Sequence, residues 1–297
     1  MSDKRIKTKN NFTENGESVV SKVPHLNGDY LPSTVRKAVE MLGDIEEVIS
    51  AGDEVMIKPN FNTPAEMPLA TNLEFLGAVI ELLQRAGAEV KVGELSGRNS
   101  WPTEDVVADL GVIPFLRRYG VEFVNFQYDQ WLDLDLDTKY WDSVSVPRSI
   151  YEADKRVYLA NMRCHSTARF TASLKLSVGW ISPKDREELH EDGHTHEQKI
   201  SDLHLGWQPD LVMIDGRRST VTPSGRGEYV YPNVVMASGD MVAIDAEAVK
   251  LLKEFPEDNE LDIPLEEMGQ FRRGVELGLG SLDYKLREAP ANTTTDQ

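Results

Sequence analysis

Most of the residues that could bind an anion lie in one stretch of the chain, from Val157 to Trp180. From Lys155 to Lys184 the sequence contains no Asp or Glu, although the whole chain has a formal net charge of -18. Between these two lysines lie four further cationic side chains and one histidine, namely Arg156, Arg163, Arg169, Lys175 and His165. Such a local excess of positive charge indicates an anion nearby, which is either a ligand or the protein's own carboxylates.

Arg163 and His165 are two residues apart, so their side chains share one face of an extended segment. Together they could hold an anionic group and exchange a proton with it, which is a common role of histidine near neutral pH. The alternative is a histidine that is hydrogen-bonded within the core. Cys164 would point to the opposite face, where we expect a buried structural thiol.

A second set of polar residues follows the predicted strands. Six of them come just after an apolar strand segment: Lys58, Asn60, Glu94, Asn161, Arg163 and Asp215. Ligands of open α/β sheets bind at the carboxyl ends of the strands, so we expect these side chains to share one site. The alternative is that several of them only cap helices or satisfy turns.

Ser96 lies in a short glycine turn, Gly93-Glu94-Leu95-Ser96-Gly97. The turn lacks the lysine of a P-loop and the three-glycine spacing of a Rossmann loop, so we predict no nucleotide site there. It remains a candidate for a loop that approaches a bound anion.

The run His190-Glu191-Asp192-Gly193-His194-Thr195-His196-Glu197 has the composition of a metal site. His190 and His194 would share one face of a helix, whereas His194 and His196 would share one face of a strand. All three histidines therefore align only if the chain bends at Gly193. The alternative is a solvated polar loop.

Two aspartates accompany the helix predicted from Asp240 to Lys253. Asp240 has the position of a helix cap. Asp245 interrupts the apolar stripe of that helix, and a carboxylate that points into a core needs a partner. Lys175 and Arg163 are the candidate partners, and in that case part of the basic stretch would be structural.

Apolar helices and strands alternate along the chain. The predicted elements are helix 31–49, strand 54–57, a helix from Thr71 or Asn72 to Gly87, strand 89–92, helix 103–119, strand 121–126, strand 157–159, a polar helix or loop 184–201, strand 211–214, strand 233–237, helix 240–253 and helix 265–277. This order implies right-handed parallel crossovers and hence an α/β fold with a doubly wound, mostly parallel sheet. The acidic segment 129–142 fits neither period and is expected to be an insertion or a short hairpin arm.

The domain organisation follows from the distribution of these elements. We expect a mobile polar tail over residues 1–30, one α/β domain over 31–285 and a disordered tail over 286–297. The domain forms either a single large unit or two intimately joined lobes, 31–128 and 150–285.

Composition limits the class of protein. Apolar residues make up 40% of the chain, but no run of about eighteen of them exists, so no membrane span is expected. The strongly acidic charge argues against nucleic acid as a partner. With Cys164 as its single cysteine, the chain can form neither an internal disulfide nor a cluster bound by several thiolates. Because the start also lacks a secretory signal pattern, we predict a cytoplasmic protein.

With these residues in view, the chain resembles domain-of-unknown-function family 362, a prokaryotic family. The matching motifs appear in the family's order over about residues 50 to 285: Ile57-Lys58-Pro59-Asn60, Thr71-Asn72, Gly93-Glu94 with Ser96-Gly97, Arg163 with His165, Lys175, Asp202-Leu203, Ile214-Asp215-Gly216, Pro223 with Gly225, and Asp240 through Asp245. The resemblance implies an α/β fold and a site at these motifs.

The chain departs from the family pattern at two motifs. It has Arg163-Cys164-His165 where members usually have Lys-x-His, and Lys175-Leu176 where they have Lys-Asn. Some relatives also carry a ferredoxin-like cluster module, which a chain with one cysteine cannot bind alone, so no iron-sulfur cluster is expected here.

These observations lead to one hypothesis and one alternative. The hypothesis is an enzyme that acts on a small anionic metabolite, a carboxylate or a phosphate, with a divalent metal. The roles are Lys58, Arg163 and Lys175 as anion ligands, His165 as acid/base, Asn60, Ser96 and Asn161 as substrate contacts, and Asp215, Glu94, His190 and His194 as metal ligands. The alternative is a non-catalytic binding or partner protein whose basic stretch is neutralised by Asp240, Asp245 and the 129–142 arm. A homo-oligomer is compatible with both.

Overall fold

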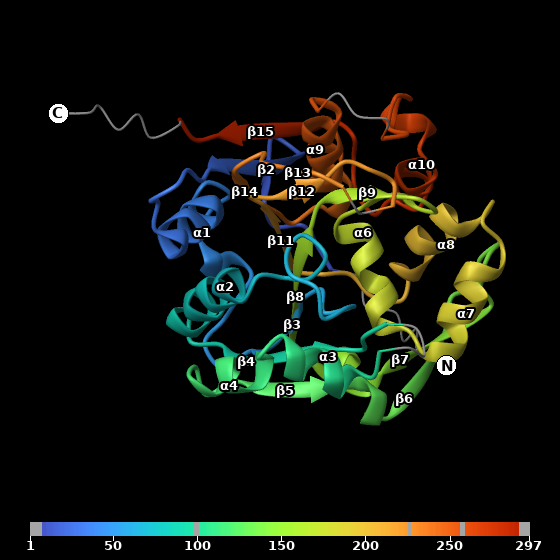
Figure 1. Ribbon diagram of the computed structural model, residues 1–297, viewed down its shortest axis with the longest axis horizontal. Helices are drawn as coiled ribbons and strands as arrows, with labels where there is room; N and C mark the ends of the chain where they lie inside the picture. The colour runs from blue at the N-terminus through green and yellow to red at the C-terminus, as the bar shows by residue number, and fades with distance from the viewer. Residues whose placement is uncertain (1–7, 98–100, 225–226, 256–258, 291–297) are drawn as a thin grey trace.

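One nine-stranded mixed sheet forms the centre of the protein (Figure 1). The computed structural model describes residues 8–97, 101–224, 227–255 and 259–290. The strand order is β1-β2-β14-β11-β8-β3-β4-β5, and β15 pairs with β2. The strands are β1 (Thr13–Glu14), β2 (Glu17–Pro24), β3 (Glu54–Lys58), β4 (Glu89–Glu94), β5 (Glu122–Asn125), β8 (Lys155–Asn161), β11 (Leu211–Gly216), β14 (Val234–Ser238) and β15 (Tyr284–Glu288).

The central strands are parallel, as predicted. Strand β3 pairs in parallel with both β4 and β8, β4 pairs with β5, and β8 pairs with β11. Strand β14 is antiparallel to β11 and to β2, which makes the sheet mixed. The chain passes from β3 outward to β5 and then returns to β8 on the other side of β3. The topological switch point therefore lies between β3 and β8, and the predicted doubly wound, mostly parallel α/β fold is confirmed.

Strands from both predicted lobes share this sheet, so the chain forms one structural unit. Their side chains alternate between two apolar cores. On β8, Val157 and Leu159 join the core beneath α1 and α2, whereas Tyr158 and Ala160 join the core on the opposite face. Burial on both faces explains why these strands are continuous apolar runs in the sequence.

Helices cover both faces of the sheet, and Figure 1 shows α1 and α2 on the side opposite α6 and α8. The α-helices are α1 (Leu31–Glu40), α2 (Leu73–Arg85), α3 (Thr103–Asp109), α4 (Val112–Arg117), α5 (Arg148–Glu152), α6 (Ser173–Leu176), α7 (Pro183–Glu191), α8 (His196–Leu203), α9 (Met241–Lys253) and α10 (Gly269–Glu276). Short 3-10 helices are η1 (Ile45–Glu47), η2 (Phe126–Tyr128), η3 (Ser177–Trp180) and η4 (Leu265–Glu267).

Local sequence signals set several helix ends. The Asn72 side chain accepts a hydrogen bond from the Phe75 amide at 3.0 Å and caps α2, and Asp240 caps α9 through the Ala243 amide at 2.9 Å. The prediction of one helix over 103–119 was wrong. Gly111 adopts a φ of 70°, in the left-handed region, and divides the segment into α3 and α4.

Both predicted tails contribute strands, so their boundaries were wrong. Strand β2 lies between β14 and β15, and its Val19 and Val20 are buried. Strand β15 pairs in parallel with β2 over Tyr284–Glu288. The polar residues around these short strands hide their apolar alternation in the sequence. Residues 1–7 and 291–297 lie outside the described part of the chain.

Three hairpins project from the main sheet. Segment 129–142 lies within a hairpin of β6 (Trp131–Asp135) and β7 (Ser143–Pro147), one of the two forms expected for it. Strands β12 (Ser219–Thr220) and β13 (Tyr229–Val230) form the second. The third joins β9 (Arg163–His165) to β10 (Arg169–Thr171) directly after β8, and it carries part of the candidate site.

Candidate functional site

A pocket of about 340 Å³ opens at the switch point of the sheet. We call it the switch-point pocket. Its walls come from the carboxyl ends of β3 and β4, the β9–β10 hairpin, and helices α6 and α7. The described residues that line it are Lys58, Asn60, Asn62, Thr63, Leu69, Glu94, Gly97, Arg163, His165, Thr167, Thr171, Lys175, Leu176, Val178, Gly179, Arg186 and His190.

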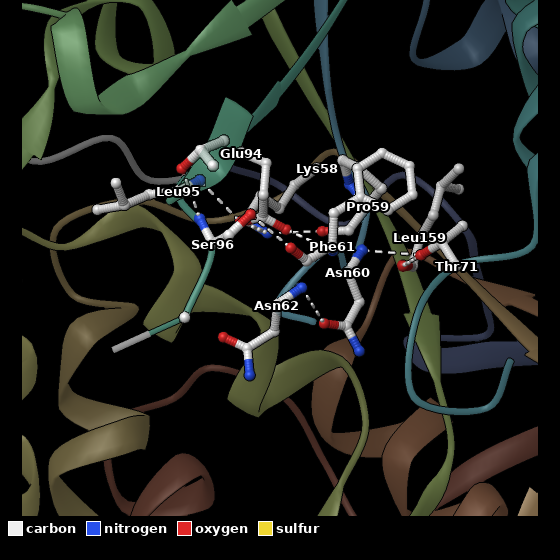
Figure 2. A network of polar contacts seen from close by, with 12 residues as sticks. Lys58, Pro59, Asn60, Phe61, Asn62, Thr71, Glu94, Leu95, Ser96 and Leu159 are labelled. Atoms are coloured by element: carbon white, nitrogen blue, oxygen red, sulfur yellow. Dashed lines mark hydrogen bonds and ion pairs between the residues drawn. The ribbon is translucent and has the colours of Figure 1, made fainter. Parts of the chain in front are cut away.

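Lys58 and Glu94 form a buried ion pair at the base of the pocket (Figure 2). The Lys58 Nζ lies 2.7 Å from Glu94 Oε1, and both side chains are almost completely buried. Glu94 also accepts hydrogen bonds from the Phe61 amide at 2.7 Å and the Leu95 amide at 2.9 Å. Desolvation lowers the pKa of Lys58 to about 8, against the opposing effect of Glu94. The pocket therefore contains an amine that titrates near neutral pH.

Gly179 lies directly against this ion pair, which occupies the space where a side chain at position 179 would be. A Cβ atom at this position would lie 2.6 Å from Lys58 Nζ and 2.7 Å from Glu94 Oε1. At these distances the ends of the Lys58 and Glu94 side chains would have to shift, so any residue with a Cβ at position 179 would disturb the ion pair.

The β9–β10 hairpin places Arg163, His165 and Thr171 on the pocket side. Arg163 pairs directly with Thr171 across the hairpin, and Cys164 pairs with Phe170 on the opposite face, where both are buried. The Arg163 guanidinium donates to the Cys164 carbonyl at 3.0 Å, but its Nε and the Thr171 hydroxyl have no hydrogen-bond partner within the described structure. Desolvation lowers the pKa of Arg163. The pocket thus presents a partly buried cation whose Nε atom is buried and has no hydrogen-bond partner among the described residues.

The His165 ring is held by its own hairpin. Its Nδ1 accepts hydrogen bonds from the Thr167 amide at 3.1 Å and the Ala168 amide at 3.2 Å. A ring nitrogen that accepts two N–H groups carries no proton, so the hydrogen of the neutral imidazole is on Nε2. Desolvation and the charges of Lys175 and Arg163 depress the pKa of His165 far below its usual value. In this arrangement His165 is a neutral hydrogen-bond donor.

Helix α6 brings Lys175 to the pocket, and Asp245 holds the start of that helix. Asp245 accepts hydrogen bonds from the Ser173 amide at 2.8 Å, the Ser173 hydroxyl at 2.6 Å and the Leu174 amide at 2.8 Å. Burial raises the pKa of Asp245 to about 7. The carboxyl group therefore holds the start of α6, and no ion pair of Asp245 with Arg163 is found in the described part of the chain, while a pairing with Lys175 stays a prediction.

Helix α7 supplies a further buried cation, Arg186. Its guanidinium donates to the carbonyl groups of Leu95, Ser96 and Gly97, the latter two at 3.1 Å. Desolvation lowers the pKa of Arg186 to about 10, so the side chain stays charged at neutral pH. Arg186 fixes the turn after β4 and adds positive charge beside Glu94.

A family model described as a domain of unknown function, DUF362, matches residues 55–250. The chain belongs to this family. The matched range includes every element that forms the switch-point pocket, so the pocket lies within the family domain. Gly225, one residue of the family motifs, lies outside the described part of the chain.

A curated relative is the thylakoid-associated protein sll1697 of Synechocystis, which is 23% identical over 193 residues. The match covers 63% of this chain and 58% of that protein, so the chain spans little more than half of its relative. No helix in the described part of this DUF362 protein is long and apolar enough to cross a membrane. The cytoplasmic location stays a prediction.

Two solved structures are similar in part. The lactate racemase apoprotein of Thermoanaerobacterium thermosaccharolyticum has a TM-score of 0.43 and 13% identity, over 85% of this chain and 59% of that chain. A protein of Thermotoga maritima has a TM-score of 0.43 and 10% identity, over 75% of this chain and 56% of that chain.

Several of the predicted site residues of this DUF362 protein line the same pocket. Lys58, Asn60, Glu94, Arg163, His165, Lys175 and His190 all line the switch-point pocket. Ser96 lines a neighbouring cavity instead, and its hydroxyl donates to the Phe61 carbonyl at 2.6 Å. Asn161 is buried at the end of β8 and is not among the lining residues, although its amide group has no hydrogen-bond partner within the described structure.

The predicted metal ligands do not form a common centre. Asp215 is held by Arg217 through contacts of 2.9 and 2.8 Å, and Glu94 is held by Lys58. His194 is exposed on the turn between α7 and α8. No group of three or more His, Cys, Asp or Glu residues in the described ranges could hold a metal ion. Arg217 occupies both oxygens of Asp215, and Lys58 and the Phe61 amide occupy those of Glu94, so neither carboxylate is available as a metal ligand in this arrangement.

The carboxylates expected to neutralise the basic stretch have other partners. Asp240 accepts hydrogen bonds from the Ser18 hydroxyl at 2.6 Å and from the Ser281 amide at 3.1 Å. None of these three residues lines the switch-point pocket. Asp129 and Asp133 of the hairpin arm accept from serines of the same arm and of the adjacent α5. Arg156 contacts Asp210 and Arg169 contacts Glu197, so carboxylates of the protein itself neutralise these two arginines.

Sequence reasoning missed Thr171, Gly179 and Arg186. Thr171 follows Arg163 by eight residues, and only the hairpin register places the two side chains opposite each other. Gly179 shows its importance only through contacts with distant strands. Arg186 lies in an acidic helix, where a single arginine is usually a surface residue.

Proposed function

We propose that the switch-point pocket binds a small carboxylate or phosphate. We further propose that the protein is an enzyme that removes a proton from this ligand. One observation carries the proposal. Four of the described lining residues are cationic, Lys58, Arg163, Lys175 and Arg186, and one is anionic, Glu94. This local charge of about +3 lies in a chain whose formal net charge is -18. Anions collect where cations converge in a concave, poorly solvated site.

The state of Arg163 supports an anionic ligand. Burying an N–H group of a cation is costly unless a hydrogen-bond acceptor, best of all a counter-charge, accompanies it. Arg163 Nε and the opposing Thr171 hydroxyl have no hydrogen-bond partner in the described structure, and both residues line the pocket. Carboxylate or phosphate oxygens placed between them would accept both hydrogen bonds and supply the missing charge.

The roles in proton transfer follow from the protonation states. His165 donates from Nε2 and would stabilise negative charge on the ligand, as a neutral donor of an oxyanion site does. Because its pKa is lowered to about 8, part of Lys58 is a neutral amine at pH 8; this neutral form would accept the proton, and Glu94 would stabilise the resulting ammonium. This assignment moves the acid/base role that the sequence suggested for His165 to Lys58. No step is assigned to a metal ion.

Calorimetric titration of the full chain with acetate, pyruvate and inorganic phosphate tests the binding step. Arg163→Gln should weaken the binding of the preferred anion at least about tenfold, because it removes one charged hydrogen-bond donor. Arg169→Gln is the matched control, because it lies on the same hairpin but contacts Glu197 at 3.6 Å. If no anion binds, or if both substitutions weaken binding equally, the proposal is wrong.

Proton transfer is tested by incubating the protein with 2-oxo acids in heavy water and following loss of the acidic C–H signal by NMR. Lys58→Met should abolish exchange while anion binding persists. The double variant Lys58→Met/Glu94→Gln removes both charges together and serves as a second, better-balanced variant. Binding without exchange in the wild type would support a non-catalytic binding protein instead.

A further inference from the structure

A second cavity of about 520 Å³ adjoins the switch-point pocket. Gly97, Arg186 and His190 line both cavities, so the two are continuous along the turn after β4 and the pocket side of α7. Four of its other eight described lining residues are apolar, Leu95, Trp101, Pro102 and Pro183, and four are polar, Ser96, Gln127, Glu187 and Glu191; because of the apolar group we call it the apolar cavity. A ligand in the switch-point pocket could therefore extend into an apolar space.

Trp101 is the main feature of the apolar cavity. Its side chain is 47% exposed, although indole is among the most favourable groups to bury. Exposed aromatic rings on concave apolar surfaces are typical of ligand sites, where the ring stacks against a bound group.

Two acidic residues restrict what this cavity can accept. Glu187 and Glu191 line it from α7 and lie four residues apart, so they share one face of that helix. Both are exposed, and their charges would repel a second anionic group at that end of the ligand. The cations of the switch-point pocket thus favour the anionic end of a ligand, and Glu187 and Glu191 favour an uncharged end in the apolar cavity.

We infer that the substrate is an amphipathic anion, with its carboxylate or phosphate in the switch-point pocket and an uncharged aromatic or aliphatic body against Trp101. The inference rests on the proposed function and adds the class of substrate to it. The charges of Glu187 and Glu191 would weaken the binding of a ligand with two anionic ends.

Paired probes separate this inference from the proposed function. Acetate is compared with 3-phenylpropionate, and inorganic phosphate with phenyl phosphate, by calorimetric titration of the full chain. In at least one pair the ligand with the ring should bind about tenfold tighter or more, because the ring is removed from water. Trp101→Ala should abolish this gain and leave binding of the small anion unchanged. Tyr231→Ala, at an exposed aromatic residue outside both cavities, is the control and should change neither.

The outcomes are distinct. If acetate or phosphate binds and the ring adds no affinity, or if Trp101→Ala leaves the gain intact, the inference is wrong and the proposed function stands. If none of the four probes binds, the proposed function itself is contradicted. A gain of affinity that Tyr231→Ala also removes would place the ring elsewhere and overturn the inference.

Discussion

Replacing Glu94 by glutamine should destabilise the protein strongly, because it leaves the Lys58 ammonium buried without a counter-charge. The two side chains are 1% and 2% exposed and their charged atoms lie 2.7 Å apart. Removing one partner of a buried ion pair costs about 3–5 kcal/mol. Glutamine keeps the size of the side chain and the hydrogen bond to one of the two amides, so the change removes the charge and the other amide hydrogen bond.

The pH dependence of this cost has a defined sign. Folding lowers the pKa of Lys58 from 10.5 to about 8, so between these values the folded protein holds fewer protons than the unfolded chain. Stability therefore rises with pH in this window, by about 3 kcal/mol for this one group. Without Glu94 the pKa of Lys58 falls further, so Lys58 loses its proton at lower pH. The difference between wild type and Glu94→Gln should be largest near pH 6 and smallest above pH 9.

Urea unfolding followed by tryptophan fluorescence measures these differences. The double variant Lys58→Met/Glu94→Gln should recover most of the lost stability, because it removes both charges from the core. A loss below about 1 kcal/mol for Glu94→Gln at pH 6 would refute the reasoning. So would a double variant that is no more stable than the single one.

Two further predictions concern the supports of the pocket. Gly179→Ala should lower the urea midpoint and weaken anion binding, because its Cβ would lie 2.6 Å from Lys58 Nζ. Gly193→Ala is the control and should change neither, because a Cβ there would meet no atom within 4 Å. Equal effects of the two substitutions would contradict the close approach of Gly179 to the ion pair. Folding raises the pKa of Asp245 to about 7, so wild type should lose about 4 kcal/mol relative to Asp245→Asn between pH 4 and 7, measured by urea unfolding at both pH values. A constant difference would show that Asp245 does not change its protonation on folding.

The central part of the fold could be predicted because its signals are local. Strand β3 is a short apolar run that ends at Lys58-Pro59, and Asn72 and Gly87 mark the ends of the following helix and its turn. Once parallel strands were expected, Lys58, Glu94 and Arg163 could be placed at one edge of the sheet. The same reasoning failed for β2 and β15, whose apolar residues are few and whose burial depends on strands more than two hundred residues away in the chain.

The contacts inside the site could not be predicted, because they depend on geometry between distant elements. The sequence indicates that Asp245 needs a partner, but only the packing of α9 against α6 shows that the partners are backbone amides. Likewise, the proximity of Arg163 and His165 follows from the sequence, whereas the proton position on His165 follows from the tight turn of its hairpin. Residue type and order predicted several of the residues that line the switch-point pocket, whereas their contacts follow from the pairing of distant elements.

Anomalous diffraction from crystals of the full chain soaked in selenate tests the central claim most directly. Selenate has the shape and charge of a small oxyanion, and selenium marks its position without reference to the protein density. The account predicts a selenium peak in the switch-point pocket, with oxygens in hydrogen-bond distance of Arg163 Nε and the Thr171 hydroxyl. Peaks confined to surface lysines and arginines, with an empty pocket at saturating selenate, would contradict it.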